Sequence, residues 1–287
     1  MARIAYVNGR YRPITDEAIG IEDRGFQFGD GLYEVWSVRR GRFLDHEEHS
    51  ARLERSLREL QIDLPVSLPA LDVILREVVR RNRFTDGLVY LQVTRGVSRR
   101  DHPFPVTPVR PTLVVTARGL DFTTIDRRAA AGIAILTLPD ERWKRCDIKS
   151  VNLLPNVLAK QKARDAGAFE AWLVDEDGCV TEGSSTTAWI LTKEGTLVTR
   201  ATDNRILWGV TRKAVRALAE QEGLRIEERG FTVEEALEAR EAFVTSASSF
   251  VMPVTSIDGR TVANGAPGSV AMRLRELYIA AADGAAR

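Results

Sequence analysis

Lys149 is the residue in this sequence best placed to act as a catalytic amine. It follows Cys146-Asp147-Ile148 and precedes an apolar run that starts after Ser150. These flanks predict a partly buried lysine, and a charge in such a place needs a reason. Further along, Glu182 lies in the sequence Thr-Glu-Gly-Ser-Ser. Two turns rich in small residues follow at 209–211 and 246–249, and either could hold a phosphate.

An amine, a carboxylate and phosphate-binding turns are the groups that amino-acid chemistry on pyridoxal phosphate (PLP) requires. A lysine holds the cofactor as an imine and moves the α-proton. A carboxylate keeps the pyridine nitrogen protonated, so that the ring withdraws electrons. Backbone N–H groups at a helix start, together with hydroxyls, bind the phosphate. The combination favours a PLP enzyme, although an isolated lysine or glutamate is more often a surface charge or a turn residue.

The composition narrows the other possibilities. The 287 residues include 41 basic and 40 acidic side chains, a balance that argues against nucleic-acid and membrane-surface partners. The N-terminus lacks the apolar segment of a signal peptide, and no run reaches the ~18 apolar residues of a membrane span. Cys146 and Cys179 are too few for a disulfide framework, which favours a cytoplasmic protein. His46 and His49 lack a third ligand, so no metal site is expected.

Hydrophobic periodicity predicts a mixed α/β chain with two domains. A linker at 119–126 would separate a small N-terminal domain, 1–118, from a larger cofactor-binding domain, 127–287. Strands are expected at 4–7, 34–38, 41–44, 88–94, 112–116 and 133–138. Apolar stripes predict helices around Leu53, Leu57 and Leu60, around 71–79, and around Val270, Leu274 and Leu277.

Helix ends can also be predicted from capping residues. Asp45 is the expected N-cap of the first long helix, and Thr211 is a possible N-cap after Gly209. Thr232 and Glu235 have the spacing of a capping box. A further helix is expected over 155–166.

The segment 147–161, Asp-Ile-Lys-Ser-Val-Asn-Leu-Leu-Pro-Asn-Val-Leu-Ala-Lys-Gln, resembles the cofactor-lysine segment of fold-type IV PLP enzymes. Segments 22–34, 181–185, 206–212 and 241–246 resemble the same family, in the same order along the chain. The resemblance implies PLP as cofactor and a two-domain α+β fold. In that fold a smaller N-terminal α/β domain is joined to a larger C-terminal domain with a β-barrel-like sheet and helices.

Roles for individual residues follow from the resemblance. Lys149 would form the Schiff base and carry the proton, and Glu182 would pair with the pyridine nitrogen. Arg52 would bind the phosphate, although an ion pair with Glu48 on the helix surface is the alternative. The remaining cofactor contacts would come from Leu207, Val210, Thr211, Ala247 and Ser248. Ordinary turn chemistry is the alternative for Ser248.

The segment 93–104 is similar to a loop of D-amino acid transaminases. Arg100 and His102 would then bind the substrate α-carboxylate together with the hydroxyl of Tyr33. In the family this loop reaches the active site of the neighbouring subunit, which implies a homodimer with active sites at the subunit interface. An exposed polar loop is the alternative for these two residues.

The resemblance implies transamination of D-amino acids, with D-alanine and 2-oxoglutarate giving pyruvate and D-glutamate. A branched-chain L-amino acid transaminase, an (R)-amine transaminase and aminodeoxychorismate lyase share the fold and remain alternatives. A PLP-binding protein without activity is an alternative of another class. Phe26, Thr187-Ala188 and Phe250 depart from the family pattern, and they affect the expected side-chain pocket rather than the lysine or the phosphate contacts.

Overall fold

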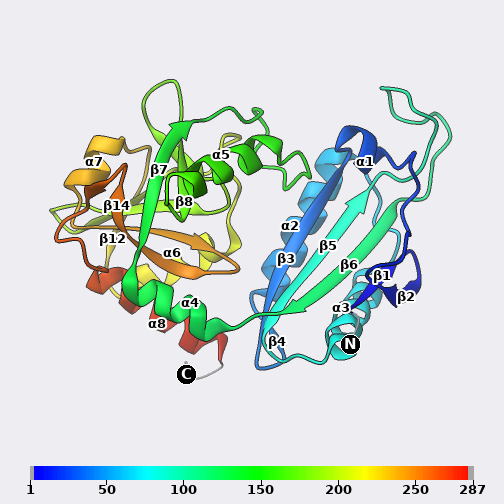
Figure 1. Ribbon diagram of the computed structural model, residues 1–287, viewed down its shortest axis with the longest axis horizontal. Coiled ribbons are helices and arrows are strands. Elements are labelled where there is room, and N and C mark those ends of the chain that lie inside the picture. Colours follow the sequence, from blue (N-terminus) through cyan, green and yellow to red (C-terminus); the bar gives the residue numbers. More distant parts are fainter. Residues whose placement is uncertain (1–2, 284–287) are drawn as a thin grey trace. The chain divides into compact units, whose positions relative to one another are not determined.

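The computed structural model describes residues 3–283, which form two compact units (Figure 1). The first unit contains the chain up to Asp121 together with Ile148–Asn152. The second contains Phe122–Asp147 and the chain from Leu153 onwards.

The first unit is an antiparallel sheet with helices. Its strand order is β2-β1-β6-β5-β3-β4. The strands are β1 (Ile4–Val7), β2 (Arg10–Pro13), β3 (Gly31–Arg39), β4 (Arg42–Phe43), β5 (Gly87–Thr94) and β6 (Thr112–Gly119). The helices are α1 (Arg24–Phe28), α2 (His46–Leu60) and α3 (Leu68–Asn82).

The core of the first unit lies between α2, α3 and one face of this sheet. Alternate residues of β3, among them Leu32 and Trp36, are fully buried there. They pack in one cluster with the predicted helix stripes, which include Leu53 of α2 and Leu75 of α3. Because side chains alternate along a strand, Tyr33 and its neighbours two residues apart are left on the opposite face.

The second unit has a larger, mixed sheet with the order β12-β11-β10-β13-β14-β7-β8-β9, and β15 pairs with β14. Its strands are β7 (Ile133–Pro139), β8 (Glu170–Val174), β9 (Val180–Gly183), β10 (Thr187–Leu191), β11 (Thr196–Thr199), β12 (Arg225–Glu228), β13 (Glu241–Ser246), β14 (Phe250–Ile257) and β15 (Arg260–Thr261). The helices are α4 (Phe122–Ala131), α5 (Leu154–Asp165), α6 (Val210–Gln221), α7 (Val233–Glu238) and α8 (Ser269–Ala282). The mixture of elements confirms the predicted α+β class.

The structure differs from the sequence-based boundaries in two places. The expected linker at 119–126 contains the start of α4, and the division between units falls after Asp121. Residues 148–152, expected in the C-terminal domain, belong to the first unit because they bond to β3.

Two of the three predicted N-caps occupy the N-cap position, Thr232 before α7 and Asp45 before α2. The Thr232 side chain accepts from the Glu235 N–H at 3.1 Å, as its spacing predicted. Asp45 does precede α2, but it adopts φ 47° and its side chain makes no cap bond. Thr211 lies inside α6, and the N-cap is Gly209, which offers no side chain to the free N–H groups.

Across residues 3–283, no helix is long and apolar enough to cross a membrane. No group of three or more His, Cys, Asp or Glu side chains in that range is arranged to hold a metal ion. Cys146 and Cys179 are free thiols.

Candidate active site

The backbone of Lys149 is hydrogen-bonded to β3 and to α2. The Tyr33 N–H donates to the Lys149 carbonyl at 2.9 Å, and the Lys149 N–H donates to Ser56 Oγ at 3.4 Å. Two residues on, the Val151 N–H donates to the Gly31 carbonyl at 3.1 Å. The short segment therefore behaves as an added strand, which fixes the direction of the lysine side chain.

The amine of Lys149 lies beside a pair of tyrosines. Its Nζ is 4.2 Å from the centroid of the Tyr33 ring, so the structure brings together two residues predicted for the site. The Tyr33 ring stacks on Tyr90 with centroids 5.5 Å apart, and the Tyr90 hydroxyl donates to Gln92 at 2.7 Å. Burial raises the pKa of Tyr90 to about 12, so this hydroxyl stays protonated. Sequence reasoning missed Tyr90, although strand alternation places it on the same face as Gln92.

Arg52 is buried in the first unit, with a side chain 9% exposed, and it pairs with Glu34 of β3. Its Nε and Nη2 donate to the two Glu34 oxygens at 3.0 and 2.7 Å, and His49 Nδ1 lies 2.9 Å from Glu34 Oε1. Burial alone would raise the pKa of Glu34, but the Arg52 guanidinium, with His49 beside it, holds this pKa well below its usual value. Burial lowers the pKa of His49, which favours a neutral ring. The cluster fixes the Arg52 guanidinium in one orientation.

The predicted substrate loop is organised by α1. The buried guanidinium of Arg24 donates to the carbonyls of Asp101 and His102 at 2.6 and 3.1 Å. The guanidinium of Arg100 lies 5.0 Å from the centroid of the Phe28 ring, and the His102 ring lies 5.5 Å from it. Phe28 thus brings the two exposed side chains together. No carboxylate of the described residues pairs with Arg100, which leaves its guanidinium available for an anion.

In the second unit, Glu182 is a buried carboxylate at the end of β9. Its Oε1 accepts from the Leu207 N–H at 3.1 Å and from Arg142 Nη1. Burial raises the pKa of Glu182, and the charge of Arg142 opposes this rise. Glu182 and Leu207, which were each predicted as cofactor contacts, are therefore hydrogen-bonded to each other.

Arg142, which contacts Glu182, is another residue that sequence reasoning missed. Its Nε and Nη2 donate to the Asp140 oxygens at 2.9 and 2.7 Å, and Thr181 Oγ1 donates to Asp140 at 2.7 Å. In sequence it lies in the polar run Glu-Arg-Trp-Lys-Arg, where nothing separates it from a surface charge. Its only signal in the sequence is its position shortly after the strand predicted at 133–138.

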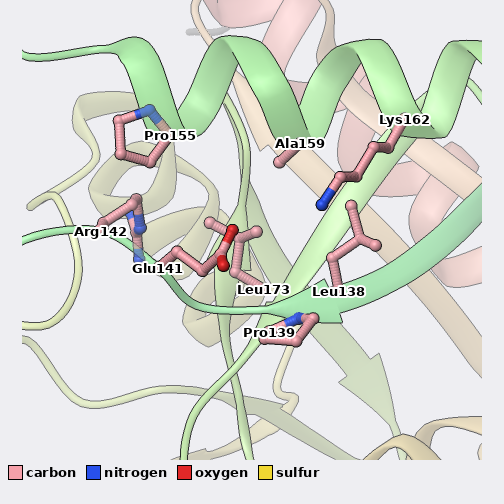
Figure 2. Close-up of a pocket in the computed structure, with 8 residues that line it drawn as sticks. All are labelled: Leu138, Pro139, Glu141, Arg142, Pro155, Ala159, Lys162 and Leu173. Carbon is pink, nitrogen blue, oxygen red and sulfur yellow. The ribbon is translucent and has the colours of Figure 1, made fainter.

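A small hollow adjoins Arg142 (Figure 2). It lies between α5 and the ends of β7 and β8, and the residues lining it are Leu138, Pro139, Glu141, Arg142, Pro155, Ala159, Lys162 and Leu173. This lining contains Arg142 but none of the predicted cofactor residues.

The start of α6 fits a phosphate. Val210 and Thr211 are its first residues, and the N–H groups there have no side-chain cap. Thr211 is 3% exposed, and its Oγ1 has no hydrogen-bond partner among the described residues. A buried hydroxyl is rarely left in this state, and an anion at a helix N-terminus would supply the partner.

The second predicted phosphate turn is a cluster of serine hydroxyls. Ser246 Oγ lies 2.7 Å from Ser249 Oγ and 3.4 Å from Ser248 Oγ, and Ala247 lies between these residues in the chain. The predicted residues thus fall in both units. Lys149, Tyr33, Arg52, Arg100 and His102 are in the first, and Glu182, Leu207, Val210, Thr211, Ala247 and Ser248 are in the second.

Comparison with known proteins decides the family. Residues 31–257 match the family described as Amino-transferase class IV. The chain belongs to the class IV aminotransferases. This aminotransferase is 45% identical to the D-alanine aminotransferase of Bacillus licheniformis, over 91% of its own length and 90% of the relative. It is 39% identical to the D-alanine aminotransferase of Listeria monocytogenes serotype 4b (strain F2365), over 95% and 94%.

Among solved structures, the class IV aminotransferase resembles a T.th. branched-chain amino acid aminotransferase with pyridoxamine 5'-phosphate. The TM-score is 0.90 at 25% identity, covering 100% of this chain and 96% of that one. The predicted fold-type IV architecture is confirmed. Class IV aminotransferases use PLP, so the predicted cofactor is confirmed as well.

Proposed function

We propose that this class IV aminotransferase transfers amino groups from D-amino acids, with D-alanine and 2-oxoglutarate giving pyruvate and D-glutamate. The observation that carries the proposal is the kinship with D-alanine aminotransferases, at 36–45% identity over 91–95% of the chain. The branched-chain enzymes among the solved structures are more distant, at 22–26% identity. These structures support the assignment of the fold, and they carry less weight for the identity of the substrate.

The residues of the chain would divide the chemistry as follows. PLP, when bound, supplies an electron sink for the bond to the α-hydrogen. Lys149 Nζ would accept the α-proton of the amino acid and later return a proton. Glu182 would accept a hydrogen bond from the pyridine nitrogen, and Arg142 beside it favours the charged carboxylate that this contact needs.

The phosphate would be held by the start of α6 and the serine turn. Val210, Thr211 and Ser248 offer N–H and hydroxyl donors there. The fixed guanidinium of Arg52 would add a cation, and guanidinium groups bind phosphate well.

The substrate carboxylate would be bound by Arg100, His102 and the Tyr33 hydroxyl. We propose that the chain forms a homodimer, in which the loop that carries Arg100 and His102 serves the active site of the partner subunit. The free thiols of Cys146 and Cys179 support action in the reducing cytoplasm.

Product analysis tests the proposal. The purified protein is supplied with PLP, D-alanine and 2-oxoglutarate, and the glutamate formed is resolved by chiral chromatography. We expect pyruvate and D-glutamate in equal amounts, and little product when L-leucine replaces D-alanine. Formation of L-glutamate from L-leucine, with none from D-alanine, would assign the chain to the branched-chain L-amino acid alternative. Protein that stays colourless after addition of PLP and removal of the excess would contradict any PLP function.

A further inference from the structure

The serine turn at 246–249 belongs to a tight hairpin with an unusual residue. It joins β13 to β14, and Ser246 pairs directly opposite Phe250. A tight hairpin often needs a left-handed residue within the turn or directly after it, and glycine usually fills that position. Here that residue is Phe250, with φ 62°, and its side chain is fully buried.

A bulky residue in this conformation costs about 1–2 kcal/mol and persists only where its surroundings hold it. The Phe250 ring stacks on Phe122 with centroids 5.3 Å apart and lies 5.4 Å from the Tyr278 ring. These contacts hold the ring. They do not by themselves fix the peptide groups on either side of it.

Arg275 of α8 contacts those peptide groups. Its Nη1 donates to the carbonyls of Ser249 and Val251 at 2.7 and 2.8 Å, which are the two residues flanking Phe250. Its Nη2 donates to Asp126 of α4 at 2.6 Å, and the Arg275 side chain is only 4% exposed. One buried guanidinium thus ties both sides of the left-handed residue to two helices.

We propose that Arg275 is a positioning residue for cofactor binding. By holding the carbonyls of Ser249 and Val251, it keeps Phe250 left-handed and the serine turn in the shape that binds the phosphate of PLP. The inference rests on the proposed function, because it takes this turn as a phosphate site. Arg275 itself acts only through the turn.

The test compares two cofactors that differ by the phosphate. Apoprotein of wild type and of Arg275→Met is titrated with PLP and with pyridoxal, and both dissociation constants are measured from the absorption of the bound cofactor. Loss of two charged hydrogen bonds to the turn should raise the dissociation constant of PLP about tenfold. The constant for pyridoxal should stay near the wild-type value, because pyridoxal has no phosphate to place.

Two further variants complete the test. Arg273→Met is the matched control, because Arg273 lies on the same helix, is 54% exposed and pairs with Glu222 at the surface. It should change neither constant. Asp126→Ala removes the partner of Arg275 on α4, a carboxylate that is 46% exposed. It should weaken PLP binding in the same direction by a smaller factor, and it decides the question if Arg275→Met does not fold.

Equal effects of the Arg275 and Asp126 changes on PLP and pyridoxal, or no effect on either, would overturn the positioning role. Failure of the wild-type protein to bind PLP would instead overturn the proposed function.

Discussion

Glu182 is a buried carboxylate whose charge depends mainly on one neighbour. Burial raises its pKa, while Arg142 and the Leu207 N–H stabilise the ionised form. A carboxylate in this setting can pair with a protonated pyridine nitrogen only while it stays charged. Arg142 therefore contributes to the proposed chemistry by stabilising the charged form of Glu182, although it lies in no recognisable sequence motif.

Replacing Arg142 with Met should raise the pKa of Glu182 further, because the Arg142 charge would no longer oppose the effect of burial. We expect the rate of the half-reaction with D-alanine to fall by about tenfold or more, since one unit of pKa is worth about 1.4 kcal/mol. The pH profile of this rate should shift to higher pH. Arg216→Met, an exposed pair with Glu220 in the same unit, is the control. An unchanged pH profile in Arg142→Met would contradict the argument.

Lys149→Ala tests the proposed amine directly. Loss of the proton carrier should lower the transamination rate by about two to four orders of magnitude. Borohydride treatment of the PLP-loaded variant should leave no cofactor attached to the peptide that contains residue 149, as judged by mass spectrometry. Lys144→Ala, a lysine five positions away, should behave as wild type. If another lysine of the variant formed the reduced PLP adduct in the same yield as wild type, the assignment of Lys149 as the Schiff-base lysine would be contradicted.

Lys149 and Glu182 could be proposed from the sequence because each lies in a segment that resembles the fold-type IV family. Arg142, Arg24 and Tyr90 could not be found in the same way. Each acts through a contact with a residue remote in sequence, such as Arg142 with Glu182. Such contacts cannot be predicted from residue type and local spacing.

At the scale of elements, the contact of α2 with β3 depends on the buried cluster of Glu34, His49 and Arg52. The pKa of His49 is lower in the folded protein than in the unfolded chain. As the pH falls below the usual value of 6.5, the unfolded chain binds a proton at His49 before the folded protein does, and this favours unfolding. The native pKa of Glu34 is also lowered, so the stability it contributes is present above 4.5 and is lost below it. Both groups make the folded state less stable in acid.

Thermal unfolding measured against pH checks this prediction. The melting temperature should fall from about pH 7.5 to about pH 5.5 through His49, and fall further at lower pH through Glu34. His49→Gln should flatten the first part of the curve. His46→Gln, on the same helix with a side chain 27% exposed, should keep most of the slope. Equal slopes for wild type and His49→Gln would contradict the assignment.

Elements were predictable where a periodic apolar face met a sheet. The stripes in α2 and α3 have the expected buried residues, because packing and periodicity favour the same structure there. The prediction failed at α4, whose short apolar face was overlooked beside the polar residues of 119–126. It failed at Thr211 as well, where the N-cap is a glycine and the threonine side chain is left for another partner.

At the scale of the whole molecule, the notable feature is that residues 148–152 belong to the first unit. These residues follow β7 in the chain, yet they bond to β3 of the first unit. A sequence-based boundary at one linker could not anticipate this, because the pairing joins residues more than a hundred positions apart. Lys149 and Glu182 therefore lie in different units of one chain.

The proposed homodimer can be tested by complementation. Lys149→Ala and Arg100→Ala should each be nearly inactive alone. If the loop with Arg100 serves the partner subunit, a mixed dimer has one site free of both changes. Random reassociation should then restore about a quarter of the wild-type activity. No recovery, with mixed dimers demonstrated by differential tagging, would mean that Arg100 acts within its own subunit or not at all.

The absorption band of the bound cofactor gives the most direct test of the central claim. The PLP form of the protein is mixed with D-alanine alone and, separately, with L-leucine alone, so that only the first half-reaction can occur. We predict that D-alanine converts the band to that of the amine form while L-leucine leaves it unchanged. Bleaching by L-leucine with no response to D-alanine would contradict the assignment of this aminotransferase to D-amino acids.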